Sequence, residues 1–182
     1  MFHHGGLGLF DREPEPGYGA GWAESLERLK RDPRERPVLV FRLAGELFAL
    51  TLDALVAVSE WRPIRTIPHR RDETLLGLVN FGGELQVCVS LEVLFDLPRP
   101  DPAARPPKGR LLVVGRHAPE WVVPVEETVT LREVVLDELV PAPTTVQHST
   151  SPYVRGIFAW DGRDVAVLDE ELLLGALARR VG

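Results

Sequence analysis

The chain has 182 residues, of which 45% are hydrophobic and 26% charged, and its formal net charge is −6. That length suits one domain or two small domains packed together. The negative charge argues against a nucleic-acid backbone or an anionic membrane as the main partner, and the strand-sized apolar runs are too short to span a bilayer. With no signal-peptide pattern and a single cysteine, the expected location is a reducing cytoplasm.

Residues 1–37 are interpreted as an N-terminal extension, which is mostly flexible because its first part is rich in glycine and proline. Residues 22–31 have helical spacing, with Trp22, Leu26 and Leu29 on one stripe. An isolated helix this short is marginal in water. The stripe therefore packs on its own domain or docks on a partner protein.

Residues 38–61 alternate between the two faces of a strand, which predicts one strand, a turn at Ala44-Gly45 and a further strand or pair of strands. After them, Gly82-Gly83 predicts a two-residue hairpin loop, because both glycines tolerate the positive φ angles of a type I′ turn. Phe81 would then pair with Glu84. The predicted core face of this hairpin carries Leu78, Leu85, Val87 and Val89.

A proline-rich linker at residues 98–107 is the predicted internal boundary. It separates a first unit at about 38–97 from a second unit at about 108–182. The second unit repeats the first, because residues 154–174 and 75–97 run in step without a gap for nineteen positions when Gly156 is set over Gly77.

The repeated hairpin has an Asp161-Gly162 loop and apolar residues on both faces. Because strands buried on both sides read in this way, we expect this hairpin in the middle of the molecule. A short helix follows it at 172–180. The sequence thus predicts two similar β units made from one chain.

No arrangement of residues indicates catalysis or metal binding. The five histidines lack zinc-ligand spacing, and Cys88 lies in an apolar strand without a basic neighbour, which favours a core position. We therefore expect a protein that is not an enzyme and that holds no cofactor or metal.

These segments together resemble the CheW-like family of chemotaxis coupling proteins. The resemblance is carried by three stretches: FRLAGELFALTLDALVAV (Phe41–Val58), GLVNFGGELQVCVSL (Gly77–Leu91) and VRGIFAWDGRDVAVLDEELL (Val154–Leu173). It implies a CheW-like domain over 38–182, an all-β fold with short helices in which two SH3-like five-stranded β-barrels pack intimately.

The resemblance also implies a function, that of a non-catalytic adaptor in a bacterial chemosensory pathway. Its partners would be the regulatory domain of a CheA-type histidine kinase and the cytoplasmic tip of a methyl-accepting chemoreceptor. The adaptor would lie in the cytoplasm at membrane chemoreceptor arrays, without inserting into the membrane and without binding nucleic acid.

Matching motif positions implies two sets of site residues. The kinase-facing strand would be residues 52–58, with contacts from Leu52, Leu55 and Ala57. The receptor-facing groove would lie between the barrels, near Asn80, Gly82, Val87 and Val89.

The chain departs from the family pattern at several of these positions. Family members commonly have Glu in place of Ala57, Arg in place of Gly82, Asp in place of Ser90 and Pro in place of Val87. Ser90 can still cap the helix that follows it.

Two alternatives remain open at this point. The same fold could serve another signalling or polar-localisation partner, docked through the helix with Trp22, Leu26 and Leu29. A more remote alternative is a small barrel that binds nucleic acid.

Overall fold

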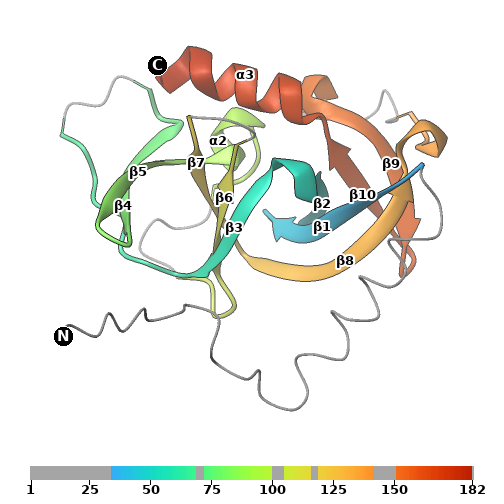
Figure 1. The fold of residues 1–182 in the computed structure, drawn as a ribbon, viewed down its shortest axis with the longest axis horizontal. Coiled ribbons are helices and arrows are strands. Elements are labelled where there is room, and N and C mark those ends of the chain that lie inside the picture. The colour runs from blue at the N-terminus through green and yellow to red at the C-terminus, as the bar shows by residue number, and fades with distance from the viewer. Residues whose placement is uncertain (1–33, 69–71, 100–104, 116–118, 142–150, 182) are drawn as a thin grey trace, which may run out of the picture. The chain divides into compact units, whose positions relative to one another are not determined.

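Ten strands form two five-stranded sheets in the computed structural model, which describes residues 34–68, 72–99, 105–115, 119–141 and 151–181 (Figure 1). These ranges belong to one compact unit beginning at Arg34. The predicted helix at 22–31 lies outside the described residues, as do residues 100–104 of the proline-rich linker.

The strands and helices have the following bounds. Sheet A has the order β8-β1-β2-β10-β9 and contains β1 (Glu35–Leu43), β2 (Glu46–Thr51), β8 (Glu127–Val135), β9 (Val154–Trp160) and β10 (Arg163–Leu168). Sheet B has the order β3-β6-β7-β5-β4 and contains β3 (Leu55–Glu60), β4 (Leu75–Phe81), β5 (Glu84–Val89), β6 (Arg110–Val114) and β7 (Trp121–Val125). The helices are α2 (Leu91–Leu94) and α3 (Glu170–Val181), with single 3-10 turns η1 (Leu52–Ala54), η2 (Leu136–Glu138) and η3 (Ser151–Tyr153).

The two copies of the repeat are interlocked, which corrects the predicted division at the proline-rich linker. Strands β1 to β5 come from the first copy and β6 to β10 from the second, yet each sheet joins two strands of one copy to three of the other. The chain changes sheets after the second strand of each copy, at η1 and at Glu126. The predicted units 38–97 and 108–182 therefore describe the sequence repeat and not the two sheets.

Both predicted hairpins are confirmed. Phe81 pairs with Glu84 in the first hairpin, and Trp160 pairs with Arg163 in the second. The loop residues Gly82, Gly83, Asp161 and Gly162 all have positive φ. The local turn chemistry therefore sets the pairing of the residues beside each loop, and each hairpin has a register shift farther along its strands.

Three apolar clusters explain why the strands are buried on both faces. The main core lies between the sheets and includes Phe41 and Phe48 of sheet A, Val123 of sheet B, and Leu173 of α3. A sheet A core, centred on Val38, Val40, Ala49, Val165 and Val167, and a sheet B core, formed by Val79, Cys88, Leu111, Val113 and Val122, fill the inside of each sheet. Each sheet thus curls around a small core of its own in an SH3-like arrangement.

The first hairpin is buried on both faces near α2, because Val87 and Val89 of the predicted face pack in the main core, and only Leu85 of that face is strongly exposed. Val79 and Cys88 are fully buried in the sheet B core, whereas Leu85 is 59% exposed. Leu85 is the second residue of β5, close to the loop, and it belongs to none of the three apolar clusters. Its apolar side chain therefore does not indicate burial.

Only one of the two strands of the second hairpin lies in the interior of its sheet. β10 lies between β2 and β9, and its Val165 and Val167 have no exposed surface. β9 is the last strand of sheet A, and its aromatic residues Phe158 and Trp160 are partly exposed.

Each hairpin leads into a helix that closes the main core. Ser90 is the N-cap of α2, where its Oγ accepts a hydrogen bond from Val93 N at 3.2 Å, so the predicted capping role is confirmed. α3 extends the predicted helix at 172–180 to Glu170–Val181 and buries Leu173, Ala176 and Leu177.

Candidate docking surface

Each sheet has a closed end, where another segment of the chain bridges to the edge strand, and an open end, where the edge strand has no further pairing partner in the described residues. At the closed end of sheet B, Arg65 forms a backbone bridge with Leu78 of β4, and at that of sheet A, Val140 forms one with Ile157 of β9. In the described part of the chain no strand pairs with the outer side of β3 or of β8. The unpaired N–H and C=O groups of these two strands are available to another chain.

The open strand β3 exposes apolar side chains. Val56 is 50% exposed and Val58 is 45% exposed, and Ala57 between them is exposed as well. The pairing of β3 with β6 is irregular between Leu55 and Ala57, so Val56 is an extra residue in the strand. A bulge of this kind re-aims side chains and is frequent at functional edges.

The predicted kinase-facing residues are only partly on this surface. Ala57 is exposed, but Leu52 and Leu55 pack against the main core. Val56 and Val58 present the larger exposed apolar surface, and neither is among the residues predicted from the motif. The predicted strand is an exposed edge strand, and the bulge, which depends on the partner strand β6, decides which of its side chains face outward.

An arginine–aromatic contact borders β3. The guanidinium of Arg62, just beyond the strand, lies 5.1 Å from the ring centroid of Phe81 in β4. Arg62 Nε also donates a hydrogen bond to Ser59 Oγ at 3.3 Å. A cation held over an aromatic ring supplies a polar rim next to the apolar centre.

The four predicted receptor-facing residues do not share one surface. Asn80 and Gly82 are exposed at the tip of the β4–β5 hairpin, where Asn80 Oδ1 accepts a hydrogen bond from Gly83 N at 2.9 Å. Val87 is half-buried against the main core, and Val89 is fully buried within it. Leu85, which was predicted to lie in the core, is the large exposed apolar residue near the tip.

The third predicted set, Trp22, Leu26 and Leu29, lies outside the described residues. Its role as a docking helix stays a prediction.

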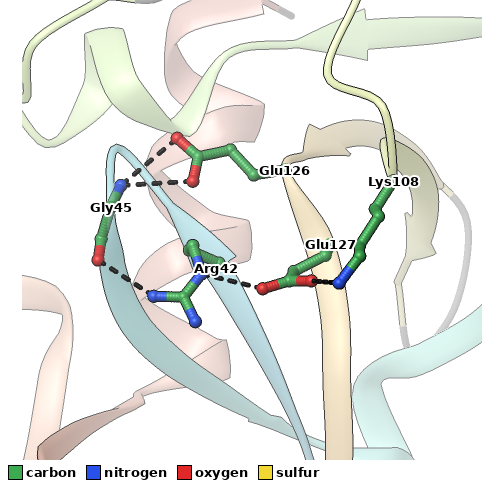
Figure 2. A network of polar contacts seen from close by, with 5 residues as sticks. All are labelled: Arg42, Gly45, Lys108, Glu126 and Glu127. Carbon is green, nitrogen blue, oxygen red and sulfur yellow. Dashed lines mark hydrogen bonds and ion pairs between the residues drawn. The ribbon is translucent and has the colours of Figure 1, made fainter.

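A polar network fixes the point at which the chain passes from sheet B to sheet A (Figure 2). Glu127, the first residue of β8, accepts a hydrogen bond from Arg42 Nε of β1 at 2.9 Å and forms an ion pair with Lys108 Nζ at 3.3 Å. The hydrogen bond from Arg42 holds the pKa of the Glu127 carboxyl below its ordinary value, against the opposing effect of burial. The neighbouring Glu126 carboxylate accepts from Gly45 N at 3.2 Å, which ties the β1–β2 turn to the same junction.

The described residues show no arrangement for metal binding or nucleophilic chemistry. Among them, no three His, Cys, Asp or Glu side chains lie together as ligands of a metal would. Cys88 has no exposed surface, and burial raises the pKa of its thiol to about 12, so the reactive thiolate is suppressed. No helix in the described ranges is long and apolar enough to cross a membrane.

Two interlocked sheets with an exposed apolar strand edge define a β-sheet module suited to binding other proteins. A family model described as CheW-like domain matches residues 37–178. The chain therefore belongs to the CheW-like domain family.

A solved structure shares this fold. The crystal structure of the scaffolding protein TtCheW from Thermoanaerobacter tengcongensis matches with a TM-score of 0.63 and 20% sequence identity, covering 74% of this chain and 89% of that chain. At this identity the match establishes the fold. A comparison with curated proteins gave no match.

Proposed function

We propose that this chain is a non-catalytic adaptor of a bacterial chemosensory pathway, which couples chemoreceptors to a CheA-type histidine kinase in the cytoplasm. The observation that supports this proposal best is the open β3 edge of a CheW-like domain, with Val56, Ala57 and Val58 exposed along it. An exposed apolar edge in a folded domain favours a protein partner, since it would otherwise promote aggregation.

The kinase contact is assigned to β3. Burying the exposed parts of Val56 and Val58 would supply the apolar centre of an interface, and Glu60 and Arg62 would form part of its polar rim. A small interface of this kind is weak by itself, but several weak contacts within an array raise the overall avidity.

The receptor contact is assigned to the tip of the β4–β5 hairpin. Asn80 and Gly82 lie at this tip, and Leu85 adds an exposed apolar side chain beside them. Val87 can contribute through its half-exposed surface, whereas the fully buried Val89 acts through packing. Gly82 has no neighbouring atoms within 4 Å of where a Cβ would stand, so a receptor helix could approach its backbone closely.

The test is co-purification with two fragments encoded in the same genome, the regulatory domain of a CheA-type kinase and a receptor cytoplasmic tip. We expect the chain to retain both fragments, Val58→Lys to release only the kinase domain, and Leu85→Asp to release only the receptor tip. If no complex with the kinase domain forms at tens of micromolar, the coupling proposal is wrong.

A further inference from the structure

Each copy of the repeat forms only hairpins with its own strands. In the first copy β1 pairs with β2 and β4 with β5, and in the second copy β6 pairs with β7 and β9 with β10. Among the described residues, the third strand of each copy pairs only with the other copy, β3 with β6 and β8 with β1. The parallel pairs β2–β10 and β5–β7 also join one copy to the other (Figure 1). Because an isolated hairpin is marginally stable at best, neither copy alone has what a stable sheet needs.

The three apolar clusters are built from both copies. In the sheet A core, Val38 of the first copy packs with Val165 of the second, and in the sheet B core Cys88 of the first copy packs with Val122 of the second. These four side chains have no exposed surface. The main core also draws on strands of both copies and on α3. Separating the copies would therefore expose all three cores, and their burial is the main force that holds the copies together.

Polar side chains also pair across the two copies. Arg180 Nη1 of α3 donates a hydrogen bond at 3.2 Å to Oγ1 of Thr74, a residue of the first copy with no exposed surface. Gln86 Nε2 of β5 donates one at 3.0 Å to Glu120 Oε2, beside the start of β7. An apolar centre with polar pairs around it is the anatomy of a specific interface between two proteins.

We infer that the two copies associate as two binding partners do, and that residues 98–107, which connect them, add only effective concentration. A short linker raises that concentration to the order of millimolar, so one chain assembles with itself when the protein is dilute. When the protein is as concentrated as this, the first copy of one molecule pairs with the second copy of another. The product is a swapped dimer with the same strand pairings as the monomer. The partner is thus a second copy of this chain, and the inference does not depend on the proposed function.

The first experiment cuts the connection in the full chain. A recognition site for a specific protease is inserted between Ala103 and Ala104, and the folded protein is cleaved. We expect both fragments to elute together at the size of the uncut chain, with an unchanged circular dichroism spectrum. The urea midpoint of the cut protein should fall with each tenfold dilution, whereas that of the uncut chain should not depend on concentration. Fragments that separate without denaturant, or a midpoint of the cut protein that dilution does not change, would overturn the inference.

The second experiment tests the exchange between molecules. The same chain is unfolded in urea and refolded at micromolar and at millimolar concentration, and the products are separated by size. We expect a dimer from the millimolar sample alone. Cleavage at the inserted site should convert this dimer into complexes of monomer size, because each swapped half is held to the other only by the connecting residues. A dimer that survives cleavage would be a surface contact, and this result, or the absence of any dimer, would contradict the exchange.

Discussion

Gly77 and Gly156 occupy equivalent positions in the two sheets, and at each of them another part of the chain passes where a side chain would stand. A Cβ on Gly77 would lie 2.2 Å from Arg65 O, and a Cβ on Gly156 would lie 2.6 Å from Leu139 Cβ. Those neighbours belong to the segments that bridge to β4 and β9. The repeated glycine therefore lets each bridging segment approach its edge strand closely enough to close that end of the sheet.

The first prediction concerns this closure. Gly77→Ala should lower the free energy of unfolding by about 3 kcal/mol, because the new methyl group overlaps the backbone of Arg65 and cannot be relieved by a side-chain rotation. The measurement is equilibrium denaturation in urea.

Gly175→Ala is the matched control for that change. Gly175 lies in α3, and the nearest atom to a new Cβ is the flexible Arg179 Nη1 at 3.3 Å. Alanine there should raise stability by about 0.5–1 kcal/mol through helix propensity. Equal effects of the two substitutions would contradict the role given to Gly77.

The second prediction concerns the sheet-to-sheet network. A double-mutant cycle with Arg42→Ala and Glu127→Ala should give a coupling energy of about 1 kcal/mol, because both side chains are mostly buried and the pair is supported by Lys108. Thermal and chemical denaturation of the four proteins would measure it. A coupling near zero would show that this pair, which joins β1 to β8 within sheet A, does not stabilise the fold.

The same pair predicts a pH dependence. The pKa of Glu127 is lower in the folded chain than its ordinary value of 4.5. The stability from this pair is therefore present above about pH 4.5 and is lost as the pH falls through the lower, folded pKa. Glu127→Gln should flatten this loss of stability below about pH 4.5, and an unchanged slope would argue against the assignment.

The third prediction concerns the thiol. Because Cys88 is fully buried and its pKa is about 12, a thiol reagent at pH 8 should leave the native chain unmodified and modify it fully in denaturant. Mass spectrometry after a timed exposure gives the fraction labelled. Rapid labelling of the native chain would mean that the sheet B core opens readily.

The hairpins and the repeat could be predicted from the sequence because their determinants are local. Gly82-Gly83 and Asp161-Gly162 select a turn that sets the pairing of the residues beside it. Ser90 and the leucines after it likewise predict a capped helix.

The interlocking of the two copies could not be predicted in the same way. The strand after η1 could pair with β2 in sheet A or join sheet B. Which pairing forms depends on contacts with β6, which is distant in sequence. The bulge at Val56 has the same origin, and it exposes Val56 and Val58 while Leu55 packs inward. The strand that carries the candidate site could therefore be predicted from the sequence, but the side chains that it exposes could not.

The central claim is that the β3 edge is where this adaptor binds its kinase. Isothermal titration of the chain with the regulatory domain of a CheA-type kinase, compared with the same titration of Val58→Lys, tests it most directly. We predict that the variant, folded and thermally stable, binds at least tenfold more weakly, a loss of about 1.4 kcal/mol or more. Equal affinities of the two proteins would contradict the claim.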